Sequence, residues 1–182
     1  MKKLIASVLL SMAASTVTAA TEQEYNFKIK HDDWQFTHRS RENTYHFEIG
    51  KDILGTEVVY RYADLDGTIE NRIKFTTEFF AYKDLVVEGR MEFRGFDNKE
   101  SHWRYRFIAE YTPHLVGPLY LYAKWQPRWS FKDAGTKFDA RDQLGITYKG
   151  DGWKITPFVE RNSTEGYHMN QTVSGIHWES NI

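Results

Sequence analysis

Residues 103–111 read Trp103-Arg104-Tyr105-Arg106-Phe107-Ile108-Ala109-Glu110-Tyr111, and residues 119–131 read Leu119-Tyr120-Leu121-Tyr122-Ala123-Lys124-Trp125-Gln126-Pro127-Arg128-Trp129-Ser130-Phe131. In both stretches every second residue is apolar, and most residues between them are polar or charged. Successive side chains of a strand leave opposite faces, so this period of two predicts β-strands. One face is aromatic at its ends and aliphatic in the middle, whereas the other is cationic. Strands of a transmembrane β-barrel have this contrast, with the apolar face on lipid and the polar face on the lumen.

The N-terminus has the three parts of a secretory signal peptide. Met1-Lys2-Lys3 is a basic start, residues 4–14 form an apolar run, and small residues continue to Ala20. The apolar run is too short to span a bilayer, so we expect export of the chain and cleavage after Ala19 or Ala20. Residues 21–182 then form a single outer-membrane β-barrel domain. The chain has no cysteine, and a barrel closed by its own hydrogen bonds does not need one.

The alternation along the chain predicts an all-β fold, an antiparallel up-and-down transmembrane β-barrel of about ten strands. The ten predicted strands cover residues 24–30, 44–50, 56–62, 71–80, 85–96, 103–111, 119–131, 143–149, 153–161 and 170–178. Trp34, Phe36 and His38 alternate again with the apolar face reversed, so a bulge or an extra hairpin is expected there, and eight or twelve strands stay open. An even number would place both chain ends at the periplasmic rim, with short turns on that side and longer connections outside.

The assigned faces predict a cation-rich lumen. The inward basic set has thirteen members: Lys28, Lys30, Arg61, Arg72, Lys74, Arg90, Arg94, Arg104, Arg106, Lys124, Arg128, Lys149 and Lys154. The inward acidic set has seven: Glu48, Glu57, Glu78, Glu88, Glu92, Glu110 and Glu160. A water-filled lumen with this surplus concentrates anions, and arginine forks onto carboxylates and sulfates. The alternative is a structural ion-pair network that fills a narrow barrel.

We expect eight basic side chains and two tyrosines to form the substrate-binding part of the lumen. They are Arg72, Lys74, Arg90, Arg94, Arg104, Arg106, Lys124, Arg128, Tyr120 and Tyr122. The basic groups would bind anions, and the inward tyrosines would stack on sugar rings. Outward tryptophans and tyrosines near the strand ends fit a membrane-interface girdle.

No motif indicates an enzyme, a cofactor or a metal site. The seven histidines lack the spacing of metal ligands, and no HExxH sequence occurs. Ser163, Glu165 and His168 are three polar residues of one connection, which is too little to predict a hydrolytic triad. The sequence also has no phosphate-binding loop and no nucleic-acid-binding motif.

The chain resembles the oligogalacturonate-specific porin family of Gram-negative outer membranes over about residues 21–182. The resemblance rests on chain size, on the signal peptide and on arginine-bearing strands such as Met91-Glu92-Phe93-Arg94 and Trp103-Arg104-Tyr105-Arg106-Phe107. It implies a narrow, monomeric barrel whose inward arginines guide anionic oligosaccharides. Unlike that family, this chain is short for twelve strands and ends in Ile182 where such barrels usually end in an aromatic residue.

The sequence therefore predicts an outer-membrane porin, a channel for passive uptake of anionic oligosaccharides with no catalytic activity. Its expected partners are outer-membrane lipid, anionic oligosaccharides and the barrel-assembly machinery. Two alternatives stay open. One is a plugged barrel that acts through its outer loops as an enzyme or adhesin, and the other is a soluble periplasmic β-barrel that binds a ligand.

Overall fold

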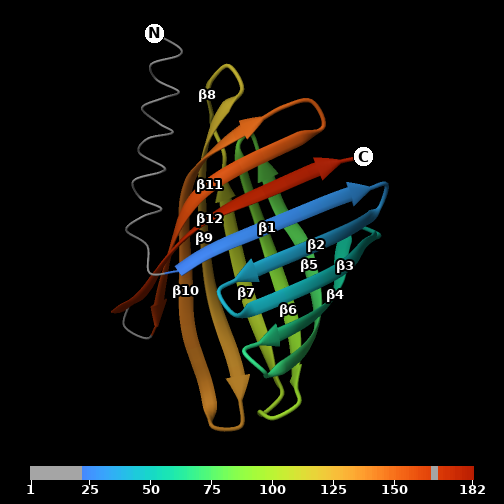
Figure 1. Ribbon diagram of the computed structural model, residues 1–182, viewed down its shortest axis with the longest axis vertical. Helices are drawn as coiled ribbons and strands as arrows, with labels where there is room; N and C mark the ends of the chain where they lie inside the picture. Colours follow the sequence, from blue (N-terminus) through green and yellow to red (C-terminus); the bar gives the residue numbers. More distant parts are fainter. Residues whose placement is uncertain (1–21, 165–167) are drawn as a thin grey trace.

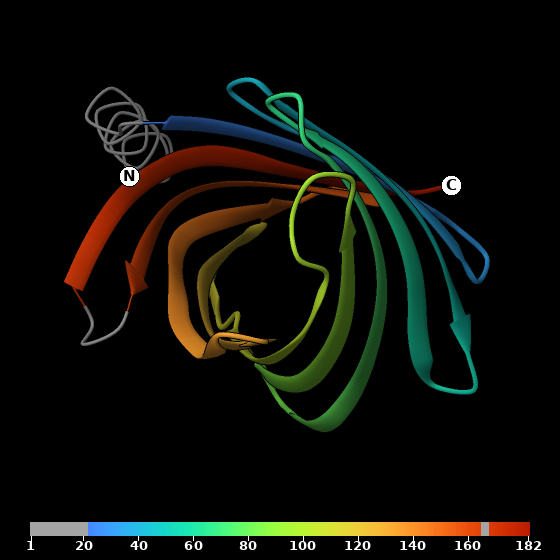
Figure 2. The ribbon, with the colours of Figure 1, turned by 90° about the horizontal axis from the view of Figure 1, so that it is seen from below.

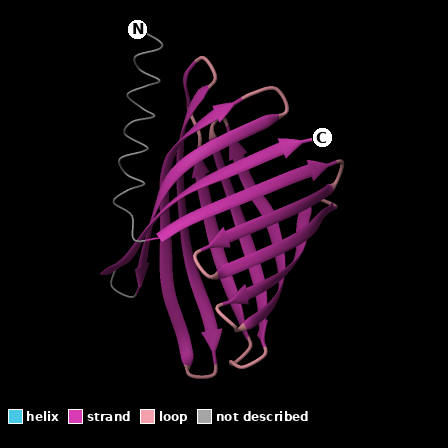
Figure 3. Ribbon diagram, in the orientation of Figure 1, coloured by secondary structure: helices cyan, strands magenta, loops and turns pink. Residues whose placement is uncertain are grey.

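The computed structural model describes residues 22–164 and 168–182, so the expected signal peptide lies outside the described residues. The chain folds into a closed barrel of inclined strands (Figure 1, Figure 2). The described part of the chain consists of strands and connections, without helices (Figure 3). It accordingly contains no helix with the length and apolar character needed to cross a membrane. The predicted all-β barrel is confirmed.

Twelve strands follow one another along the chain. They are β1 (Glu22–His31), β2 (Trp34–Arg41), β3 (Thr44–Ile53), β4 (Thr56–Leu65), β5 (Ile69–Tyr82), β6 (Leu85–Phe96), β7 (His102–Tyr111), β8 (His114–Val116), β9 (Leu119–Lys132), β10 (Gly135–Lys149), β11 (Trp153–Thr164) and β12 (His168–Asn181). Eleven of them form the wall, each paired with its neighbours on both sides. The short β8 pairs only with β9 and stands above the end of β7 (Figure 1).

The barrel closes where β1 and β12 pair in parallel, from Glu22 opposite Val173 to Lys30 opposite Asn181. All other pairings are antiparallel. An odd number of wall strands requires one parallel contact, because the first and last strands then run in the same direction. The wall therefore agrees with the predicted count of about ten strands but not with an even number, and the start of β1 and the end of β12 lie at opposite ends of the barrel (Figure 1).

An additional hairpin explains why the apolar face reverses near Trp34. Residues 32 and 33 form a two-residue turn, and Ile29 of β1 lies opposite Phe36 of β2. Asp32 has a φ of 50°, a left-handed conformation that aspartate tolerates better than most residues. Of the two expected arrangements, the hairpin is correct and the bulge is not.

The connections define two rims. The rim that we call the β8 rim holds the β1–β2, β3–β4, β5–β6 and β10–β11 turns and the connection that contains β8. The opposite rim, which we call the Glu42 rim, holds the β2–β3, β4–β5, β6–β7 and β9–β10 turns. Described connections at the Glu42 rim have only two to five residues. The predicted longer connections are wrong there, chiefly because residues 135–142 extend β10 instead of forming a loop.

The outer surface of the wall is largely apolar. Its exposed large side chains include Tyr25, Phe27, Ile29, Phe36, Phe47, Tyr60, Ile73, Phe75, Met91, Phe93, Trp103, Trp125, Leu144 and Trp153. Inward neighbours are buried; Phe75 is 41% exposed and the adjacent Thr76 is 5% exposed. One ion pair, from Arg161 to Asp142 at 2.8 Å, interrupts this apolar surface.

Candidate functional site: a cation-rich barrel interior

The barrel encloses a cavity of about 790 Å³ to which all eleven wall strands contribute lining residues. The lining includes Glu42 and Asp66 at the Glu42 rim, and Lys149 and Lys154 at the β8 rim. The cavity therefore extends along the barrel from one rim to the other. Nine of the ten predicted binding residues line it, and Tyr120 does not.

Strand register places inward arginines directly opposite one another in two rows. The rows are Arg61–Arg72–Arg94 on β4, β5 and β6, and Arg90–Arg106–Arg128 on β6, β7 and β9. Like charges directly opposite each other destabilise a sheet. These rows can persist only because carboxylates, water or bound anions offset the repulsion.

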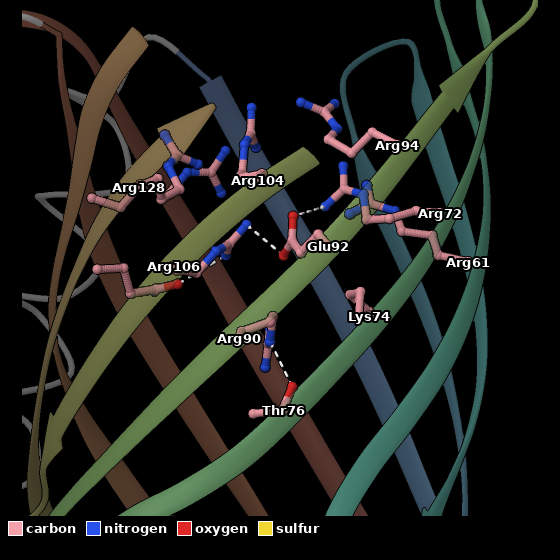
Figure 4. A network of polar contacts seen from close by, with 12 residues as sticks. Arg61, Arg72, Lys74, Thr76, Arg90, Glu92, Arg94, Arg104, Arg106 and Arg128 are labelled. Carbon is pink, nitrogen blue, oxygen red and sulfur yellow. Dashed lines mark hydrogen bonds and ion pairs between the residues drawn. The ribbon is translucent and has the colours of Figure 1, made fainter. Parts of the chain in front are cut away.

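Glu92 is the carboxylate that joins the two rows. Its side chain is fully buried, with Oε2 accepting a hydrogen bond of 3.1 Å from Arg72 and Oε1 lying 3.1 Å from Nη2 of Arg106. Figure 4 shows Glu92 surrounded by guanidinium groups from both rows. One negative charge thus serves two arginines, which leaves the centre of the wall positively charged.

A second set of carboxylates lies behind the lining arginines. Glu70 is fully buried and accepts hydrogen bonds from Arg72 and Arg94, and Asp139 pairs with Arg128. Glu160, also fully buried, lies 3.5 Å from Arg141. None of these three carboxylates lines the cavity. They hold the guanidinium groups in place without competing for the space in front of them.

Two lining arginines form no ion pair with a described carboxylate, although Arg104 lies opposite Glu92 in the strand register. Nε of Arg90 donates to the Thr76 hydroxyl at 2.8 Å, and Nε of Arg104 donates to the Ser130 hydroxyl at 3.0 Å. Both bonds leave the terminal nitrogens of the guanidinium fork unused. These two side chains are the clearest candidates for binding a mobile anion.

The described lining contains fifteen basic and nine acidic side chains, a surplus of six. Counting the three carboxylates behind the lining reduces that surplus to three. The interior is therefore net cationic although the whole chain has a formal charge of −1. A low-dielectric wall around such a surplus raises the local concentration of anions.

The sequence prediction of the lining was incomplete for residues outside the predicted strands. Arg39, Arg41 and Arg141 also line the cavity, but they lie in segments that were expected to be connections. The predicted acidic members Glu78 and Glu88 do not line it. The register of β5 shifts between Glu78 and Phe80, so simple alternation ends there.

The two predicted tyrosines have different surroundings. Tyr122 is buried in the lining and donates a hydrogen bond of 2.8 Å to Oε1 of Gln143. Tyr120 lies nearer the β8 rim, with Nζ of Lys149 3.8 Å from the centre of its ring. The hydroxyl of Tyr122 and the ring face of Tyr120 therefore already have partners within the protein.

The described residues contain no group of three or more histidine, aspartate or glutamate side chains arranged to hold a metal ion. Of the three polar residues considered for a triad, Ser163 is buried in β11, and Glu165 lies outside the described residues.

The fold and the interior define a closed β-barrel with a cation-rich cavity between its two rims. Comparison with protein-family models, curated proteins and solved structures found no match to this chain.

Proposed function

We propose that the protein is an outer-membrane channel through which anionic oligosaccharides pass by diffusion, as a monomer embedded in lipid after assembly by the barrel-assembly machinery. The observation that carries this proposal is the pair of arginine rows on one wall of a cavity that reaches both rims. Opposed arginines cost folding free energy, and a passing anion offsets that cost while it is bound. Several such sites in succession allow binding that is weak enough for release.

The outer surface supports a lipid environment for the barrel. Large apolar side chains such as Phe27, Phe47 and Phe75 are 41–56% exposed, and they recur on successive strands. A soluble protein rarely exposes apolar side chains over so much of its surface. The soluble periplasmic alternative leaves this surface without a partner.

The described turns give less support to a barrel that acts through its loops. At the Glu42 rim, described connections are two to five residues long, and the longest one at the β8 rim has seven residues, three of them in β8. Short turns present few side chains with which to build a catalytic or adhesive surface. The channel proposal instead uses the side chains that the strands themselves point inward.

Single-channel recording of the purified protein in a planar bilayer tests the proposal. We expect ohmic conductance, a preference for chloride over potassium in a salt gradient, and block by trigalacturonate but not by maltotriose. The triple variant Arg104→Glu, Arg106→Glu, Arg128→Glu should lower or reverse the anion preference, with a smaller effect at high salt. Absence of conductance, or unchanged selectivity of the triple variant at low salt, would refute the channel mechanism.

A further inference from the structure

The basic residues of the cavity are segregated along the barrel axis by type. The ten lining arginines lie in the middle of their strands or toward the Glu42 rim: Arg39, Arg41, Arg61, Arg72, Arg90, Arg94, Arg104, Arg106, Arg128 and Arg141. Four of the five lining lysines lie in the halves of their strands nearer the β8 rim: Lys28, Lys124, Lys149 and Lys154. The exception is Lys74, which pairs with Glu48 at 2.6 Å.

The lining of the mouth at the β8 rim has one more basic than acidic side chain. Lys28, Lys149 and Lys154 line the cavity there, and two carboxylates partly balance them. Glu179 is shared, lying 3.3 Å from Lys154 and 3.0 Å from Lys30, and Glu57 lies 3.8 Å from Lys28. The amino group of Lys149 lies over a tyrosine ring and forms no ion pair with the described residues.

The mouth at the Glu42 rim is negatively charged. Glu22, Glu42 and Asp66 line the cavity there, and of these only Glu22 has a cationic partner among the described residues, Arg41. Glu42 and Asp66 are exposed at the tips of their turns. An anion that approaches this rim therefore meets two unpaired carboxylates, beside the paired Arg41, before it reaches the arginine rows.

From these positions we infer that the channel is directional in its binding kinetics: anionic oligosaccharides enter faster at the β8 rim than at the Glu42 rim. This inference rests on the proposed channel function. Lysine ammonium groups are strongly hydrated point charges that attract an anion at a distance, whereas arginine forks hold carboxylates at close range. Lysines at the β8 rim would capture the anion, the arginine rows would hold it, and Glu42 and Asp66 would oppose entry from the far side.

The absence of cysteine from the chain allows the orientation in a bilayer to be measured. Leu54 is fully exposed at the tip of the β3–β4 turn on the β8 rim. A Leu54→Cys variant labelled with a membrane-impermeant maleimide–biotin reports which chamber faces that rim, when streptavidin is added to one side. Block by trigalacturonate is then recorded after addition to either chamber, at mirrored voltages and low salt.

We expect the association rate from the β8 rim to exceed that from the Glu42 rim about 3- to 10-fold, at or below the lower end of electrostatic steering because the charge difference between the rims is small. In 1 M salt the ratio should approach one. Equal rates at low salt, or faster entry from the Glu42 rim, would overturn the inference and leave conductance and anion selectivity intact. A protein that does not conduct would refute the proposed function as well.

Neutralising the acidic mouth provides a second test. Glu42→Gln with Asp66→Asn removes both unpaired carboxylates at exposed turn positions, so the barrel should fold normally. The association rate from the Glu42 rim should rise several-fold, and the rate from the β8 rim should not change. The matched control is Asp97→Asn with Asp133→Asn, which neutralises two turn residues of the same rim that do not line the cavity. An equal effect of both double variants would contradict the role of the cavity mouth.

Discussion

Replacing Arg90 by glutamine distinguishes two roles for the lumen arginines: binding of a passing anion, or stabilisation of the barrel through an ion-pair network. Arg90 lies opposite Arg106 and forms no ion pair with any described carboxylate; its Nε donates to Thr76 at 2.8 Å. A glutamine amide can also donate to that hydroxyl. The substitution removes a like-charge contact between neighbouring strands, which is worth up to about 1 kcal/mol. Arg90→Gln should therefore leave the barrel as stable as the wild type or make it up to about 1 kcal/mol more stable.

Arg72→Gln is the matched comparison, because it removes the same charge from the adjacent row. Arg72 donates to Glu70 and Glu92, two fully buried carboxylates, so glutamine leaves each with a weaker partner. Hydrogen bonds to charged groups contribute about 1.5–3 kcal/mol, and this variant should lose that amount of stability. Both variants should show a smaller reversal potential in a potassium chloride gradient, since each removes one lumen cation.

Urea unfolding in lipid vesicles, followed by tryptophan fluorescence, measures the stability difference between the two variants. The decisive outcome is the sign of the change in the free energy of unfolding caused by Arg90→Gln. If this variant is destabilised by as much as Arg72→Gln, Arg90 belongs to a structural network, and the opposed arginines are not evidence for an anion path. If its stability is retained while its anion preference falls, the surplus of charge serves binding.

Two further predictions concern the wall and the central carboxylate. Phe36→Arg places a charge on the apolar outer surface and should cost about 2–4 kcal/mol if the position lies near the bilayer midplane. Thr37→Arg points into the cavity between Glu48 and Lys28, whose opposite charges offset each other, and should cost far less. The heat-dependent mobility of unboiled samples on a detergent gel gives the folded fraction, and similar yields would mean that the faces are misassigned. Glu92→Gln removes the carboxylate shared by both arginine rows and should lengthen the dwell time of trigalacturonate several-fold in single-channel records. The control is Glu70→Gln, which removes an equally buried carboxylate outside the lining and should mainly lower stability. A longer dwell time in the Glu70 variant would contradict this assignment.

The sequence predicted those strands whose two faces differ in polarity. Residues 103–111 and 119–131 correspond almost residue for residue to β7 and β9. The first half of β10 was missed because charge appears on both of its faces: Arg141 points into the cavity, and Asp142 pairs with Arg161 on the outer surface. Alternation carries no signal where both faces are polar.

The segments that were not predicted as strands also explain why the site was predicted only in part. β2 follows a two-residue turn that moves outward positions from odd to even numbers, so Arg39 and Arg41 were not assigned to the lumen. The opposed arginines could be predicted only for strands joined by recognised hairpins, because pairing register depends on turn length. Axial segregation of lysine and arginine requires the register of the whole wall, which no single stretch of sequence contains.

Strand number depends on the whole barrel in the same way. Each strand and each turn can be inferred locally, but whether the total is odd or even depends on every segment, and one missed hairpin changes it. In this chain the stretch of β2 was left open between a bulge and an extra hairpin, and with β2 the wall has eleven strands and a parallel seam between β1 and β12. At that seam Lys28 lies directly opposite Glu179, so the closure of the barrel helps to assemble the lysine-rich mouth at the β8 rim. Whether the number of wall strands is odd or even therefore affects the chemistry of the cavity as well as the positions of the chain ends.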